Sequence, residues 1–167
     1  MSDQVDRLVT AWHRARPDLD VEPLEVLSRV VRLARHLALA RKQAFARQHL
    51  PEWQFDVLAA LRRADPPHEL TPGELLEETL VSSGTMTHRL DELEEAGFVT
   101  RQPDPDDGRV VRVRLAPAGR KAVDAALTAL LDRERELLDP LSAKDRRELA
   151  ALLRRLLLPF DARGQAP

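Results

Sequence analysis

The chain has 167 residues, 43% of them hydrophobic and 32% charged, and its formal net charge of −2 excludes a uniformly basic protein but not a local basic surface. The low aromatic share of 4%, with abundant Leu and Ala, favours a mainly α protein. The sequence has no cysteine, which excludes disulfides and thiolate metal sites, and no apolar run suits a signal peptide or a membrane span, so we expect a cytoplasmic protein.

Two helices are expected in the first 50 residues. Apolar residues at helical spacing predict a short helix from about Asp3 to Ala15, on which Trp12 is expected to lie in the core. A second helix, from Glu22 to about Gln48, carries an apolar stripe through about seven turns. A small domain cannot cover so long a stripe by itself, so we expect this helix to pack against a partner chain.

A third helix is expected from Pro51, which suits the first helical position, to about Ala64. Its apolar residues lie on several sides, which is typical of a buried helix. Asp56 is the exception, because a carboxylate between Phe55 and Val57 needs a partner if it is buried. The simpler interpretation is an exposed acid.

Two short capped helices with a tight turn between them follow. Thr71 and Glu74 form a capping box, with Pro at the first helical position, and this helix is expected to reach about Thr79. Ser82 is the expected cap of the next helix, which stops at Gly97. This arrangement is typical of a helix-turn-helix.

The second of these helices has a polarity pattern suited to DNA. Met86, Leu90 and Leu93 take its core positions, and its acidic residues come only in the later turns. Its first turns are uncharged and rich in hydroxyls, and short polar side chains let a helix approach base edges closely. The residues on these open faces are Ser83, Thr85, Thr87 and His88.

Residues 98–102 and 109–115 predict a two-stranded hairpin, with residues 103–108 as its turn. This hairpin is the expected wing. Arg109 beside the turn is expected to enter the minor groove, oriented by Asp107. Together with the helix, the wing gives these DNA-binding candidates: Ser82, Ser83, Thr85, Thr87, His88, Arg109 and Arg112.

The remaining chain predicts two more helices. One runs from about Pro117 to Leu138 with small residues that allow close helix packing, and Ser142 caps the other, whose leucine stripe is expected to dimerise. The fold class is therefore mainly α with a small β-wing. We expect dimerisation and ligand-binding helices in residues 1–50, a winged helix-turn-helix domain in 51–116, dimerisation helices in 117–160 and a tail in 161–167.

This order of elements resembles the MarR family of bacterial transcriptional regulators over nearly the whole chain. The matching pieces are residues 70–75 (LTPGEL), 84–90 (GTMTHRL), 93–99 (LEEAGFV) and 104–109 (DPDDGR). The resemblance implies a homodimer that binds double-stranded DNA at a pseudo-palindromic operator. The family's wing pattern of Asp, any residue, Arg falls on Asp107 to Arg109. Members often carry a second Arg where this chain has Gly108, which implies a weaker wing contact.

The chain also looks like the urate-responsive branch of that family, which has an added N-terminal helix. The branch's ligand-binding Trp, Asp and two Arg fall on Trp12, Asp56, Arg89 and Arg101. The chemistry fits, because guanidinium groups bind the oxygens of an anionic purine and a carboxylate accepts its ring N–H groups. The resemblance therefore implies a repressor that a small anionic effector such as urate releases from DNA.

Several alternatives stay open at this point. In two of them the regulator class is the same, but the effector is a tricarboxylate, or the regulator responds to pH through His49. In a third, Asp56 and Arg89 form a structural pair and bind no ligand. In a fourth, the winged helix is a protein-interaction module without DNA binding. An enzyme is not expected, because there is no phosphate-binding glycine loop, no His pair at metal-ligand spacing and no nucleophile elbow. No metal and no cofactor are expected.

Overall fold

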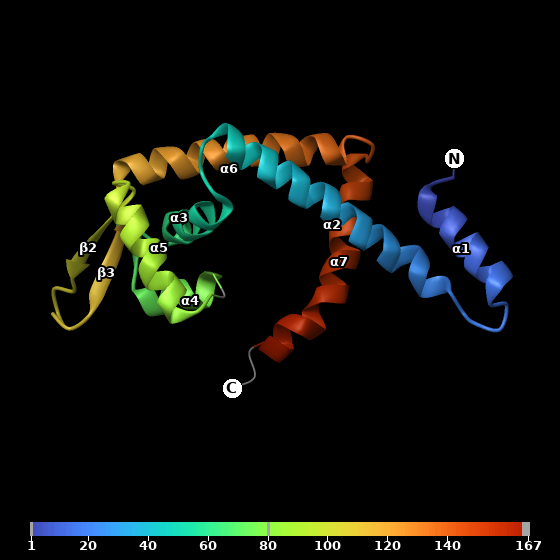
Figure 1. Ribbon diagram of the computed structural model, residues 1–167, viewed down its shortest axis with the longest axis horizontal. Helices are drawn as coiled ribbons and strands as arrows, with labels where there is room; N and C mark the ends of the chain where they lie inside the picture. Colours follow the sequence, from blue (N-terminus) through green and yellow to red (C-terminus); the bar gives the residue numbers. More distant parts are fainter. Residues whose placement is uncertain (1, 80, 165–167) are drawn as a thin grey trace.

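The computed structural model describes residues 2–79 and 81–164, and the side chains of residues 162–164 are not described. Figure 1 shows the strands and the helices of residues 52–95 gathered at one end, the long helices of residues 22–47 and 117–138 meeting in the middle, and the N-terminal helix beside the far end of the first of these. The elements of the described residues are α1 (Gln4–Ala15), α2 (Glu22–Arg47), α3 (Glu52–Arg63), β1 (Glu69–Leu70), α4 (Pro72–Thr79), α5 (Ser83–Glu95), β2 (Val99–Pro103), β3 (Val111–Leu115), α6 (Pro117–Leu138) and α7 (Ala143–Gly164). The predicted fold class, mainly α with a small wing, is confirmed.

Helix α1 is a small outlying layer held against α2. Asp3 caps it by accepting hydrogen bonds from the backbone N–H groups of Val5 and Asp6. Arg29 of α2 pairs with both Asp3 and Asp6, at 2.9 and 2.5 Å. Trp12, in contrast, is 46% exposed in the single chain. The prediction that it lies in the core is therefore wrong. Its helix has only a narrow buried face, centred on Val5.

Helix α2 packs along α6 and leaves an apolar side open. The exposed positions of this side are Val26, Leu27, Val30, Val31 and Leu33. Helix α7 adds a second open apolar surface at Leu152, Leu156, Leu157, Leu158 and Phe160. Single exposed apolar residues are ordinary, but rows of them on two neighbouring helices are typical of a surface that binds another chain.

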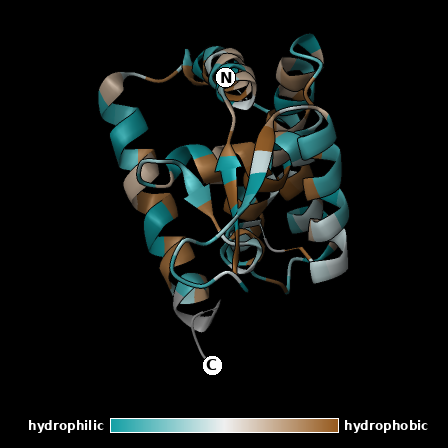
Figure 2. Cartoon of the chain, turned by 90° about the vertical axis from the view of Figure 1, so that its left-hand side faces the viewer, coloured by the Kyte–Doolittle hydropathy of each residue, from teal (hydrophilic) through white to brown (hydrophobic). Residues whose placement is uncertain are grey.

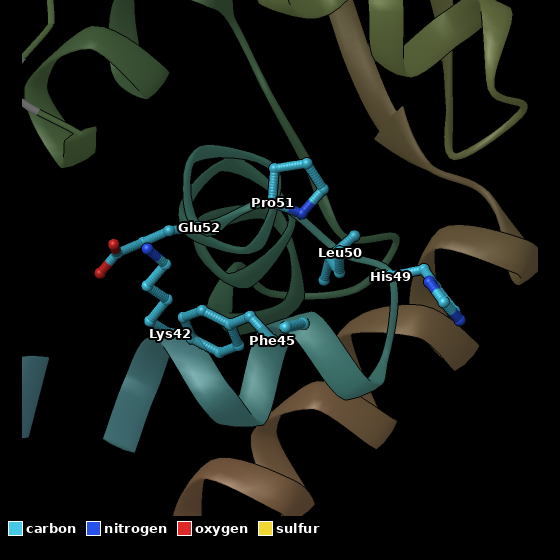
Figure 3. Close-up of a pocket in the computed structure, with 7 residues that line it drawn as sticks. Lys42, Phe45, His49, Leu50, Pro51 and Glu52 are labelled. Atoms are coloured by element: carbon cyan, nitrogen blue, oxygen red, sulfur yellow. The ribbon is translucent and has the colours of Figure 1, made fainter. Parts of the chain in front are cut away.

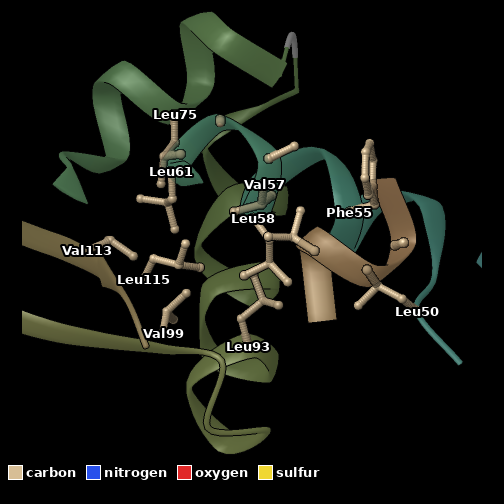
Figure 4. Close-up of a cluster of buried hydrophobic side chains, with 14 of the residues drawn as sticks. Leu50, Phe55, Val57, Leu58, Leu61, Leu75, Leu93, Val99, Val113 and Leu115 are labelled. Carbon is tan, nitrogen blue, oxygen red and sulfur yellow. The ribbon is translucent and has the colours of Figure 1, made fainter. Parts of the chain in front are cut away.

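The main core surrounds α3, against which the helix-turn-helix and the wing pack. Val57, Leu58 and Leu61 of α3 are fully buried. Around them pack Leu75, Leu93, Val99 and Val113 from four other elements, as Figure 4 shows. Figure 2 views the molecule from this end and shows hydrophobic segments gathered behind the sheet. The core thus fixes α5 and the wing on one common base.

The sheet has three antiparallel strands in the order β1-β3-β2, of which the sequence predicted two. Strand β1 pairs Glu69 with Arg114 and Leu70 with Val113. A strand of two residues has too few positions for an alternating pattern, so it left no signal in the sequence. Gly119 is required here because a Cβ would lie 2.2 Å from the carbonyl oxygen of Phe98.

Two helix ends differ from the expectations. Pro51 precedes α3 as its N-terminal cap residue, and the first helical residue is Glu52. Helix α7 continues through Pro159 to Gly164, past the expected start of a tail, and residues 165–167 lie outside the described residues. Across the described ranges, none of the helices combines the length and the apolar character that crossing a membrane requires.

Candidate DNA-reading surface and effector site

Helix α5 presents the polar face that the sequence predicted. Ser82 caps it, and the residues predicted for its core, Met86, Leu90 and Leu93, are at most 2% exposed. The predicted DNA-reading residues Ser83, Thr85, Thr87 and His88 are all exposed. The helix therefore turns hydroxyl and imidazole groups outwards on the side that its core residues leave free.

The acids in the second half of α5 are partly neutralised by the wing. The Arg101 guanidinium on β2 lies 2.6 Å from Oδ1 of Asp91 and 3.6 Å from Oε2 of Glu94. The backbone N–H of Arg101 also donates to Glu94. On the outer side, His88 lies 2.8 Å from Glu92. Arg101 thus fastens β2 to α5 and reduces the negative charge beside the exposed polar face of α5.

The wing turn is organised by carboxylates. Asp104 accepts hydrogen bonds from the backbone N–H groups of Asp106 and Asp107. Asp107 accepts from the backbone N–H of Arg109 at 3.0 Å. Asp107 was predicted to orient the Arg109 side chain, but its hydrogen bond is to the backbone, so it shapes the turn instead. The Arg109 side chain itself is exposed at the turn.

The two arginines of β3 are each held by an acid. Arg112 Nε lies 2.6 Å from Oδ2 of Asp104, and Arg114 Nη2 lies 2.8 Å from Oε2 of Glu69. The hydrogen bond from Arg112 holds the pKa of Asp104 below its ordinary value, and the same contact raises the pKa of Arg112. Arg112, predicted to bind DNA, is therefore engaged within the wing.

The four predicted ligand residues do not meet within one chain. Trp12 lies on α1, at the opposite end of the molecule from α5 and β2 (Figure 1). Arg101 is held by Asp91 and Glu94, and its buried Nε has no hydrogen-bond partner among the described residues. The Arg89 guanidinium stacks over the ring of Trp53, 5.4 Å from the ring centroid. A site with all four residues therefore needs a second chain.

Asp56 is half-exposed, and its ion pair is with Arg41 of α2 at 3.6 Å. The alternative in which Asp56 pairs with Arg89 is not found among the described residues. Partial burial raises the pKa of Asp56, and the positive charges of Arg41 and Arg89 oppose that rise. This carboxylate is thus more costly to charge than an ordinary surface acid.

A cleft of about 310 Å³ opens beside this carboxylate, and we name it the Asp56 cleft. It is lined by Arg41, Phe55, Asp56, Ala59, Arg63, Glu78 and Thr79. The sequence did not point to Arg41 and Arg63 in this cleft, or to the indole of Trp53 under Arg89. One signal was available, since Trp53, Asp56 and Arg63 recur at i, i+3 and i+10 on α3, close to one helical face. The contribution of Arg41 comes from a different helix, which a single sequence does not reveal.

A second hollow, of about 420 Å³, lies at the corner between α2 and α3. Figure 3 shows Lys42 and Glu52 on one side of it and His49 on the other. Phe45 and Leu50 form much of its base and are buried in the main core. The positive charge of Lys42 is balanced by the negative charge of Glu52, and the base is apolar, so this hollow has no preference for an anion.

The fold and this surface can be compared with known proteins. The family model described as "MarR family" matches residues 50–110, which include the helix-turn-helix and the first part of the wing. The HTH-type transcriptional regulator PecS of Dickeya dadantii is 33% identical over 153 residues, which cover 92% of each chain. The chain belongs to the MarR family. It is accordingly a DNA-binding transcriptional regulator and not an enzyme.

Two solved structures extend the comparison. A mutant of MarR from Escherichia coli, crystallised in complex with operator DNA, has a TM-score of 0.66 and 27% identity, and the match covers 83% of this chain and 99% of that one. Bordetella bronchiseptica BpsR, whose DNA binding is regulated by 6-hydroxynicotinic acid, has a TM-score of 0.62 and 25% identity. That match covers 78% of this chain and 91% of BpsR. The family fold thus extends well beyond the residues of the family model.

Proposed function

We propose that two copies of this chain form a repressor that binds a pseudo-palindromic operator and is released by a small organic anion. The open apolar surfaces of α2 and α7 are the proposed dimer contacts, because both lack cover in a single chain. A two-fold dimer places its two copies of α5 in successive major grooves, roughly 34 Å apart.

The observation that carries the DNA-binding part is the exposed, uncharged first half of α5 beside the exposed Arg109. In the proposed complex, Ser82, Ser83, Thr85, Thr87 and His88 contact bases and phosphates, and Arg109 enters the minor groove. The MarR structure in complex with operator DNA supports duplex binding by this fold.

The proposed effector is a small planar anion such as urate. Asp56 and Arg89 contact it, and Trp12 of the second chain covers it. Arg89 belongs to α5, and Arg101 forms an ion pair with Asp91 of α5. An anion that binds either guanidinium therefore changes the contacts of the proposed DNA-reading helix. The regulation of BpsR by 6-hydroxynicotinic acid, another small planar anion, supports this class of effector.

A selection experiment tests the proposal and does not require the operator sequence to be specified. The purified chain is mixed with random DNA duplexes, and bound duplexes are amplified and sequenced. We expect an inverted repeat with half-sites about one helical turn apart, bound with a strong dependence on salt. Urate is then expected to release this duplex from the wild-type protein but not from Arg89→Ala or Asp56→Asn. Recovery of no enriched sequence, or unaltered release from both variants, contradicts the proposal.

A further inference from the structure

The polar side chains in the first turns of α5 differ in what they leave free for DNA. The hydroxyl groups of Ser82 and Thr85 lie 2.9 Å apart and form a hydrogen bond. The Thr87 hydroxyl donates to the carbonyl oxygen of Ser83 at 3.2 Å. His88 has the longest side chain of this face, and 78% of that side chain is exposed. Its imidazole is therefore the group of this face best able to reach a base edge.

Glu92, one helical turn further along α5, lies against this imidazole. Its Oε1 is 2.8 Å from Nδ1 of His88. A carboxylate oxygen at this distance attracts an N–H group and repels a nitrogen lone pair, so it favours the forms of the ring in which Nδ1 carries a proton. A neutral imidazole carries only one proton, which leaves Nε2 as a hydrogen-bond acceptor.

The charged groups around His88 leave this effect to Glu92. No other acid forms an ion pair with His88 in residues 2–79 or 81–164. Helix α5 packs against β2 and α4, and Arg101 of β2 is held by two other acids of α5. The acids of α4, which form no ion pair with His88, are Glu74, Glu77 and Glu78. The protons of the His88 ring are therefore governed by Glu92 and, in a complex, by the bound DNA.

We propose that Glu92 is a positioning residue that makes His88 read one base pair through Nε2, which accepts from the amino group of cytosine or adenine in the major groove. Cytosine offers N4 and adenine N6 as the donor there, whereas guanine offers only acceptors. Protonation of the ring turns Nε2 into a donor and reverses the preference towards guanine. This inference rests on the proposed DNA contact of α5 and assigns to one of its residues the class of base that it recognises.

The state of the ring is tested on the full chain without DNA. Two-bond proton–nitrogen NMR spectra distinguish the two neutral tautomers of histidine, and the signals of His88 are those that vanish in His88→Ala. At about pH 8.5, well above the ordinary pKa of histidine, we expect the Nδ1–H form in wild type. In Glu92→Gln, whose amide can either accept or donate, we expect a mixture of both forms. A wild-type ring with its proton on Nε2 overturns the inference, as does a tautomer that Glu92→Gln leaves unchanged.

The base preference is tested by selection from random duplexes at about pH 8.5, with wild type and His88→Ala in parallel. The position that His88 reads in each half-site is the one whose preference His88→Ala loses. We expect cytosine or adenine there, favoured over guanine by about fivefold, which corresponds to one neutral hydrogen bond. At about pH 5.5, where histidine is mostly protonated, we expect wild type to bind guanine at this position at least as tightly as cytosine.

The decisive variant is Glu92→Gln, with Glu95→Gln as the matched control, because both remove one negative charge from an exposed acid of α5. Both are therefore expected to bind every duplex more tightly. Only Glu92→Gln is expected to lose the discrimination against guanine at about pH 8.5, while Glu95→Gln retains it. Discrimination that survives Glu92→Gln overturns the inference, and so does a wild-type preference for guanine at this pH.

The outcomes separate this inference from the proposed function. A chain that selects an inverted repeat whose base preferences all survive in His88→Ala supports the proposed function and overturns the inference. A chain that selects no duplex contradicts the proposed function, and the base reading with it, whatever the tautomer of the ring.

Discussion

Arg112 is bound by Asp104 inside the wing, with Nε 2.6 Å from Oδ2, and only 9% of the Asp104 side chain is exposed. Asp104 also accepts two backbone N–H groups of the turn that leads to Arg109. The guanidinium of Arg112 is thus a support for the turn that presents Arg109. We therefore propose that Arg112 acts in DNA binding by positioning this turn, without contacting the DNA itself.

The first prediction concerns Arg112→Gln. This change is expected to weaken operator binding several-fold, because the turn loses the partner of Asp104, while the slope of log Kobs against log salt stays that of wild type. The slope counts phosphate contacts, and none is removed if Arg112 only supports the turn. Titrations by fluorescence anisotropy at several salt concentrations measure both quantities. A slope smaller by about 1 means that Arg112 contacts a phosphate directly.

The second prediction concerns pH. The hydrogen bond from Arg112 lowers the pKa of Asp104 in the folded protein, so the stabilisation of the turn is complete above the ordinary carboxyl pKa. It is lost as the pH falls through the lowered value. The amide resonances of Asp106 and Asp107 are expected to shift together in that acidic range. In Asp104→Asn they are expected to show no such transition, and a transition that persists in this variant assigns it to another acid.

The third prediction concerns Arg109→Ala. The exposed guanidinium at the wing turn is expected to contribute one contact to the DNA, so its loss lowers the magnitude of the salt slope by about 1. Arg120→Ala on α6 is the matched control, since Arg120 is also exposed and its acid, Asp124, is 3.9 Å away. Equal changes in the two variants indicate a general charge effect in place of a wing contact.

Local sequence signals predicted the caps and the core positions of α4 and α5 well. Thr71 and Glu74 form the predicted capping box, with bonds of 2.7 and 3.2 Å, and Ser82 caps α5 as expected. Such caps involve residues three positions apart, so the sequence contains the whole interaction. The core residues of α5 follow from helical periodicity in the same way.

Interactions between distant segments were not predictable in this way. Arg41 reaches Asp56 from another helix, and Trp53, not Trp12, lies under Arg89. These partners depend on how α2, α3 and α5 pack, which residue spacing within one helix does not contain. The contact between Arg112 and Asp104 was missed for a related reason, because it depends on the register of β2 and β3, which pairs Pro103 with Val111 and so places Asp104 near Arg112.

The fourth prediction concerns the proposed dimer. Val30→Glu on α2 is expected to dissociate the dimer, because it buries a charge in an apolar contact between two chains. Val111→Glu on the wing is the control, since Val111 is 41% exposed and Val30 is 39% exposed. Light scattering after size-exclusion chromatography measures the mass of each variant. A dimer that survives Val30→Glu places the contact elsewhere.

The fifth prediction concerns Asp56→Asn. Burial raises the pKa of Asp56, so the charged form is disfavoured in the folded protein at neutral pH, and this cost disappears as the pH falls through the raised value. The asparagine variant without ligand is therefore expected to be more stable than wild type at neutral pH, by about a few tenths of a kcal/mol for a half-exposed group.

Urea unfolding at neutral pH and at about pH 4, near the ordinary carboxyl pKa, measures this difference, with Asp132→Asn as the control. Asp132 is an exposed acid paired with Arg135, and its replacement is expected to bring no gain. A gain for Asp56→Asn that shrinks at the lower pH, combined with loss of anion binding, indicates a carboxylate kept for its ligand at a cost in stability. A variant that is less stable than wild type at neutral pH instead indicates that the contact with Arg41 outweighs the cost of burial.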